Sequence, residues 1–337
     1  FGSQYERVLP ASSVANLYPF NYSGKTDPHG FYLGRDKFGT NILTDFDRRS
    51  DDKTNANVLI LGNSGQGKSH LLKGILANLR ESGKSLIVLD PEQEYQELCE
   101  NLGGCYLDYL SGEYVINPLQ PQNWDEDPVN EDDERTPEQR DAAPISRFPI
   151  SESGKLAPAP ETSVVPVPGP FQKTTMLSRH ISYLKDFFRS YKDFTTAQLD
   201  TIELMLQKLY RRFDMDDYTD FSQVAPEKFP TMSDFYDLLE EEFDLYDPKR
   251  KNLFSEETIQ EVCLGLHSMC KGAESKYFNG HTNIKDDKFL VFGVKGIMEL
   301  NRSLRDALLF SILSYMTNAL LGAGNYVGAL DELYLFL

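Results

Sequence analysis

The sequence has few of the residues that build disulfide frameworks and zinc sites. It contains four cysteines in 337 residues, and none of them forms a Cys-x-x-Cys pair. Cys263 and Cys270 lie seven positions apart on an expected helix, where buried thiols are the simplest explanation. Cys99 and Cys105 have no histidine nearby at the spacing of metal ligands. Thiols of this kind fit a reducing, cytosolic setting.

Positive charge is also scarce. Lysine and arginine total 34 against 52 acidic residues, which gives a formal net charge of −18. A protein that coats nucleic acid needs clustered Lys and Arg, so the composition argues against that class. The composition does not exclude a local basic patch.

Long apolar runs are missing as well. The first residues, "FGSQYERVLP", do not form a signal peptide. Residues 307–330 carry no charged side chain, but hydroxyl and amide side chains interrupt them and "GAG" follows at 322–324. We expect a buried helix and then a short strand here, not a membrane span.

One short stretch carries a clear chemical signal. "LGNSGQGKSH" follows the apolar residues "NVLI" and matches the pattern G-x-x-x-x-G-K-[ST]. The glycines let successive backbone N–H groups point at a phosphate, and the next helix adds its positive end. Lys68 is expected to reach the β- and γ-phosphates, and Ser69 to bind Mg²⁺. The predicted nucleotide-binding residues are Gly62, Asn63, Ser64, Gly65, Gln66, Gly67, Lys68, Ser69 and His70, although packing on the helix surface is the simpler explanation for His70.

The order of elements around this loop predicts an α/β fold. "VLILG" is expected to be a buried strand, "KSHLLKGILANLRESG" a helix that Gly83 stops, and "SLIVLD" (85–90) the next strand. Two short strands are expected within "CYLDYLSGEYVINPL". A small antiparallel pair, "GFYLG" and "NILTDF", precedes the loop. Strand, helix, strand at this spacing indicates a parallel crossover.

The composition changes at Pro121. Residues 121–172 hold ten of the eighteen prolines and several acidic runs, so we expect a disordered, acidic, Pro-rich insertion. Residues 173–272 show four helical patterns, with caps expected at Thr195–Gln198 and Thr231–Asp234. The predicted domains are a first part of the core at 1–120, this insertion, an all-α insertion at 173–272, and a second part of the core at 273–337.

The second part of the core ends on an acidic pair. "FLVFGV" predicts a strand and "MELNRSLRDALLFSILSYMTNALL" a long buried helix; "NYVGALDE" then gives a strand followed by Asp331 and Glu332. Asp331 is expected to hold Mg²⁺ through water, and Glu332 to polarise the attacking water as general base. Asp90 and Glu94 should lie near the same edge of the sheet. Glu94 could contact that water or a neighbouring subunit's site, or it could simply cap the turn.

These parts predict a Mg²⁺-dependent nucleotide hydrolase. The Asp-Glu pair and the apparent absence of an N-K-x-D guanine motif favour ATP over GTP.

The sequence resembles a known family at this point. "ILGNSGQGKSHLLK", "IVLDPEQEYQELCENLGGCYLDYLSGEYVINPL", "FPTMSDFYDLL", "YFNGHTNI" and "LDE" are similar to the ATPase domain of the CagE/TrbE/VirB family, the ATPases of type IV secretion and conjugal transfer. This family is related to the HerA/FtsK translocases. The resemblance covers most of the chain outside 121–172, and the "DPEQEY…GG…INPL" run is its most specific part.

The resemblance implies a RecA-like P-loop core with an all-α insertion. It also implies a motor that works as a hexamer at the cytoplasmic face of the membrane, peripheral to the membrane. Its partners would be other secretion-system subunits and the coupling protein, with DNA as a further candidate. Family roles carry over to Lys68, Ser69, Asp331 and Glu332.

Two departures from the family pattern leave alternatives open. The Pro-rich insertion is unusually long, and the sequence ends six residues after Asp331, where the family continues with further strands and a trans-acting arginine. We therefore expect a fragment that also lacks the family's N-terminal domain. The alternatives are a HerA/FtsK-like DNA translocase and a nucleotide-binding assembly subunit with little turnover.

Overall fold

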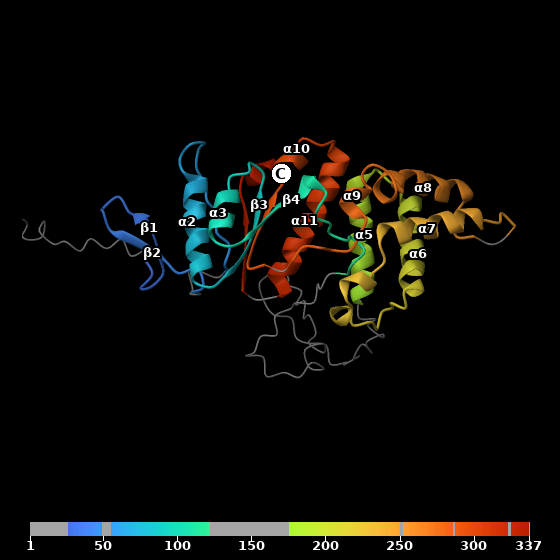
Figure 1. The fold of residues 1–337 in the computed structure, drawn as a ribbon, viewed down its shortest axis with the longest axis horizontal. Coiled ribbons are helices and arrows are strands. Elements are labelled where there is room, and N and C mark those ends of the chain that lie inside the picture. The colour runs from blue at the N-terminus through green and yellow to red at the C-terminus, as the bar shows by residue number, and fades with distance from the viewer. Residues whose placement is uncertain are drawn as a thin grey trace, which may run out of the picture. The chain divides into compact units, whose positions relative to one another are not determined.

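The computed structural model describes residues 26–48, 55–121, 175–249, 252–285, 287–322 and 325–336. Contacts divide the chain into two units (Figure 1). Unit 1 comprises residues 1–114, 285–300 and 325–337, and unit 2 comprises residues 115–284 and 301–324. The predicted acidic, Pro-rich insertion lies outside the described residues, apart from Pro121.

Unit 1 is built on a parallel sheet. Its strands are β3 (Ser85–Asp90), β4 (Cys105–Asp108), β5 (Phe289–Gly293) and β6 (Tyr326–Leu330), in the spatial order β4-β5-β3-β6. All three strand pairs are parallel. The predicted strands at 85–90, at 289–294 and in "NYVGAL" are confirmed, and so is the mixed α/β class with a RecA-like P-loop core.

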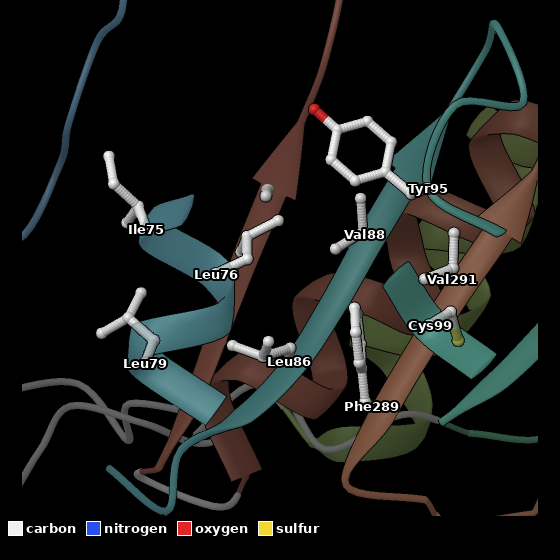
Figure 2. Close-up of a cluster of buried hydrophobic side chains, with 10 residues drawn as sticks. Ile75, Leu76, Leu79, Leu86, Val88, Tyr95, Cys99, Phe289 and Val291 are labelled. Carbon is white, nitrogen blue, oxygen red and sulfur yellow. The ribbon is translucent and has the colours of Figure 1, made fainter. Parts of the chain in front are cut away.

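Two helices cover one face of this sheet. Helices α2 (Lys68–Glu81) and α3 (Gln96–Asn101) enclose a buried cluster with alternate residues of the strands (Figure 2). Because side chains alternate along a strand, these residues point to the same side. The cluster consists of Ile75, Leu76, Leu79, Leu86, Val88, Tyr95, Cys99, Phe289, Val291 and Ala329.

A two-stranded antiparallel sheet precedes the core, as predicted. Strand β1 (Phe31–Arg35) pairs with β2 (Asn41–Thr44). The Asp36 carboxylate holds the turn between them, because it accepts hydrogen bonds from the backbone N–H groups of Phe38 at 2.8 Å and Thr40 at 2.9 Å.

Two strand predictions are wrong. Residues 58–62 form no strand, and Val58, Leu59 and Leu61 are 59%, 70% and 82% exposed. An apolar run becomes a buried strand only when a neighbouring strand pairs with it, and within the described residues β6 pairs with β3 alone. The second strand expected after β4 is also absent. Residues 114–117, after the Ser111-Gly112 turn, form no strand, and the Val115 N–H donates to the Asn283 side-chain oxygen at 2.8 Å. A 3-10 turn, η1 (Tyr109–Ser111), follows β4, and the Asp108 carboxylate caps it at the Leu110 N–H.

Unit 2 is helical. The four predicted helices are present as α5 (Met176–Tyr191), α6 (Thr196–Arg212), α7 (Met232–Asp244) and α8 (Glu256–Cys270). The expected capping boxes at Thr195–Gln198 and Thr231–Asp234 both form. The remaining short elements of this unit are η2 (Phe221–Gln223), η3 (Pro226–Lys228) and α9 (Ser275–Phe278).

The long apolar helix of the C-terminal half is α11 (Arg302–Gly322), which packs on α5. Contacts therefore group α11 with the helical unit, although its residues belong to the predicted second part of the core at 273–337. The four-part division of the chain stays a prediction. Two short elements, α10 (Lys295–Met298) and η4 (Leu333–Phe336), belong to unit 1. No helix among the described residues has the length and apolarity needed to cross a bilayer.

Candidate nucleotide-binding site

The predicted phosphate loop runs directly into α2. Gly67 is the residue before the helix, with a φ of 85°, and Gly65 has a φ of 76°. Both angles lie in the left-handed region that glycine adopts without strain. No side chain caps the helix, and its first turn contains no acidic residue. The N-terminal amides of α2 therefore face no competing carboxylate from their own turn, which suits an anion.

The side chains of the loop differ in exposure. Lys68 and Ser69 are half-buried, whereas His70 and all six residues from Gly62 to Gly67 are exposed. The exposure of His70 agrees with packing on the helix surface. An exposed loop of small and polar residues at a helix N-terminus can surround a phosphate from several sides.

The carboxyl ends of β3 and β6 bring the acidic residues together. Leu89 lies opposite Leu330 in the ladder, and the Asp331 N–H donates to the Leu89 carbonyl at 3.4 Å. Asp90 and Asp331 therefore leave the sheet at the same level. By the alternation of the pleat they lie on the side of Val88 and Ala329, the side that α2 covers.

Asp331 is 8% exposed, and both of its carboxylate oxygens accept hydrogen bonds. The Tyr95 hydroxyl donates to Oδ2 at 2.7 Å, and the Glu332 backbone N–H donates to Oδ1 at 2.8 Å. Glu332 itself is half-buried and has a φ of 47°. In Figure 2 the Tyr95 hydroxyl points toward the end of β6.

Asp90 organises the turn after β3. It is fully buried, and its two oxygens accept from the Glu94 N–H at 3.0 Å and the Tyr95 N–H at 2.9 Å. Burial raises the pKa of Asp90, and backbone hydrogen bonds from this turn oppose the rise. Because Asp90 is fully buried and both of its oxygens bind backbone N–H groups of the turn, it acts as a structural carboxylate.

Glu94 lies on the outside of the same turn. Its side chain is 47% exposed, and Oε2 is 3.5 Å from the Lys73 ammonium on α2. The same ammonium lies 5.2 Å from the centre of the Tyr95 ring. The turn after β3 is therefore linked to the helix that carries the phosphate loop.

The predicted acidic residues thus meet at one end of the sheet, and the structure adds two residues that sequence reasoning did not select. Tyr95 and Lys73 carry no motif of their own. Tyr95 does lie in the "DPEQEY" run, which is the most family-specific part of the sequence. That specificity was the one feature of the sequence that could have pointed to Tyr95. The described residues contain no cluster of three or more His, Cys, Asp or Glu side chains that could hold a metal. Magnesium at Ser69 and Asp331 would need phosphate oxygens and water as further ligands.

Known proteins are similar to this chain in sequence and in fold. Residues 35–133 match the sequence model of the TraG P-loop domain. The chain is 34% identical to protein TraC of Escherichia coli (strain K12) over 96 residues, which is 28% of this chain and 11% of TraC. Its fold matches the structure of VirB4 of Thermoanaerobacter pseudethanolicus with a TM-score of 0.69 and 26% identity, over 93% of this chain and 69% of that one.

The chain is VirB4/TraC-like. The resemblance inferred from its motifs is thereby confirmed. A VirB4/TraC-like chain has the P-loop NTPase fold, which accounts for the parallel sheet, the loop before α2 and the acidic end of β6. An uncharacterized protein of Bacillus anthracis is also similar, at 21% identity over 96% of this chain and 46% of that protein. The chain spans less than half the length of the two curated relatives.

Proposed function

We propose that this chain is the nucleotide-hydrolysing part of a motor for type IV secretion or conjugative transfer. One observation carries the proposal: an uncapped helix end behind a Gly-rich loop lies on the face of the sheet where the buried Asp331 leaves β6, with the half-buried Glu332 next to it. The similarity to VirB4 over 93% of the chain supports it.

The proposed roles follow from the geometry. Loop amides and Lys68 bind the phosphates of ATP; Ser69 and Asp331 hold Mg²⁺, Asp331 through a water. Mg²⁺, when bound, neutralises charge on the β- and γ-phosphates. Glu332 takes the proton of the water whose oxygen attacks the γ-phosphorus, while the bond to the bridging oxygen breaks and ADP leaves. Glu94, on the turn after β3, is proposed to contact this water or a neighbouring subunit's site.

At a larger scale, we propose that the full-length protein is a hexamer at the cytoplasmic side of the cell membrane. Its proposed partners are other secretion-system subunits and the coupling protein. The net charge of −18 favours partners other than DNA for most of the surface.

The test measures ATP hydrolysis with two variants and matched controls. We expect Lys68→Ala to lower ATP affinity and turnover by about 100-fold, because the phosphates lose their only side-chain cation among the proposed binding residues. We expect Glu332→Gln to keep ATP binding and to lower turnover by roughly 100-fold or more, because the general base is lost. Lys37→Ala on the β1–β2 turn and Glu97→Gln on α3 should behave like the unchanged protein.

Added DNA separates the alternatives. A secretion motor should hydrolyse ATP at the same rate with and without single- or double-stranded DNA. Strong stimulation by DNA would instead indicate a translocase of the HerA/FtsK type. Tight Mg²⁺–ATP binding without turnover would indicate an assembly subunit.

A further inference from the structure

The hydroxyl of Tyr95 is held by a residue 236 positions away in the sequence, Asp331. Tyr95 is fully buried, and Asp331 is 8% exposed, so water contributes little to either group. A carboxylate accepts and cannot donate, so the phenol is the donor in the 2.7 Å bond.

This bond restricts how Asp331 can turn. Its Oδ1 accepts from the Glu332 N–H and its Oδ2 from Tyr95, so both torsions of the short side chain are fixed. Each oxygen keeps a second lone pair for a water molecule. A carboxylate held in this way can approach a metal-bound water without first losing rotational freedom.

Tyr95 is itself held from two directions. Its backbone N–H donates to the buried Asp90, and the ammonium of Lys73 lies 5.2 Å from the centre of its ring. Lys73 also pairs with Glu94 at 3.5 Å. A cation over an aromatic face attracts the ring. Lys73 stands five residues after Lys68 on the same helix, so the ring is tied to the element that carries the phosphate loop.

We propose that Tyr95, held from α2 by Lys73, is a positioning residue that fixes the Asp331 carboxylate for a magnesium-bound water and so sets the magnesium affinity of the nucleotide site. This inference rests on the proposed function. It adds a link between the phosphate loop, the turn after β3 and the acid that follows β6. Neither the P-loop pattern nor the acidic pair implies this link.

The experiment titrates Mg²⁺ against the binding of a fluorescent ATP analogue to the whole chain. Tyr95→Phe removes one oxygen and keeps the ring. We expect it to raise the Mg²⁺ concentration at half-saturation by about 10-fold, the lower end of the range for residues that orient metal ligands. Affinity for the analogue in EDTA should stay the same, and excess Mg²⁺ should restore turnover. Tyr106→Phe is the control, because its phenol lies on β4 of the same unit and has no hydrogen bond to a carboxylate among the described residues.

Two further variants keep the test decisive. Lys73→Met removes the ammonium from a partly exposed position, so it should fold even if Tyr95→Phe does not. We expect it to raise the half-saturating Mg²⁺ concentration by about 3-fold, since it loosens the ring without removing the phenol. In an Asp331→Asn background, Tyr95→Phe should cause no further change, because the phenol acts through that carboxylate.

The possible failures are distinguishable. If the unchanged chain shows no Mg²⁺-dependent nucleotide binding, the proposed function fails and the inference fails with it. If the unchanged chain does show it, but Tyr95→Phe and Lys73→Met leave the Mg²⁺ titration unaltered, only the role of Tyr95 is overturned. An equal loss of affinity with and without Mg²⁺ would also overturn it, since that pattern marks a general structural defect.

Discussion

Glu332 has a backbone φ of 47°, a value that non-glycine residues rarely adopt. Its N–H donates to the Asp331 side chain, and the 3-10 turn η4 begins at the next residue. A side chain in the left-handed region costs about 1 kcal/mol or more relative to glycine. The position therefore carries local strain, which is common at functional sites.

The strain at Glu332 can be measured. We expect Glu332→Gly to be more stable than Glu332→Ala by about 1 kcal/mol, because glycine adopts a positive φ without the contact that a Cβ makes. Denaturant unfolding of the two variants gives this difference. Equal stability, or greater stability of the alanine variant, would show that the position is not strained.

His180 on α5 is a buried group that titrates. It is fully buried, its ring stacks on Tyr183 with centres 5.5 Å apart, and it meets the edge of Tyr210. Burial lowers the pKa of His180 to about 3. The unfolded chain takes up a proton below about pH 6.5, and the folded chain does not until the pH is far lower. Stability from this residue is therefore present above about pH 6.5 and falls as the pH drops toward 3.

The corresponding variant is His180→Phe, which keeps an aromatic ring and cannot be protonated. Between pH 7 and pH 5 we expect the unchanged protein to lose about 2 kcal/mol more unfolding free energy than the variant does. Denaturant midpoints at the two pH values test this, with the exposed His29→Phe as control. The same pH dependence in His180→Phe and the unchanged protein would contradict the assignment.

At the scale of elements, helix starts are where local sequence predicts structure best. Thr195 accepts from the Gln198 N–H at 3.3 Å, and the Gln198 side chain accepts from the Thr195 N–H at 2.8 Å. Both bonds join residues three positions apart, so the pattern can be read directly from the sequence.

The cap also gives a prediction for α6. We expect Thr195→Ala to destabilise the protein by about 1 kcal/mol, because a backbone N–H at the helix start loses its acceptor. Thr196→Ala, one residue further and equally exposed, should change stability by less than about 0.5 kcal/mol. Thermal unfolding of the two variants gives both losses of stability. An equal loss in the two variants would show that the Thr195 cap does not stabilise α6.

The strand predicted at 58–62 shows the limit of local reasoning. Its apolar run has the composition of a buried strand, but a strand also needs a partner, and pairing is decided by other parts of the chain. The strands at 85–90 and 289–293 were predicted correctly because each is an apolar run with a paired neighbour. The same argument applies to the second strand expected after β4: residues 114–117 pair with no strand among the described residues, and the Val115 N–H donates to the Asn283 side chain instead.

At the scale of the whole molecule, the sequence predicted the fold and the acidic pair but not how the site is connected. The phosphate loop and the end of β6 each carry a local pattern. The bond from Tyr95 to Asp331 has none, because it joins positions that only the parallel sheet brings together. The sequence also did not predict that α11 belongs to the helical unit, because the sequence of an apolar helix does not indicate which helices it packs against.

The order of strands in the sheet has a consequence for biosynthesis. Strand β3 pairs with β5 and β6, and both follow it by roughly 200 residues or more, a delay of about 10 to 50 s at usual rates of translation. Helices α5 to α9 lie between them in the sequence and need only contacts that are closer in the chain. On the ribosome, the helical unit can therefore begin to fold before β5 and β6 are synthesised, while both edges of β3 are still unpaired. The nucleotide site can be complete only once the residues that follow β6 have emerged.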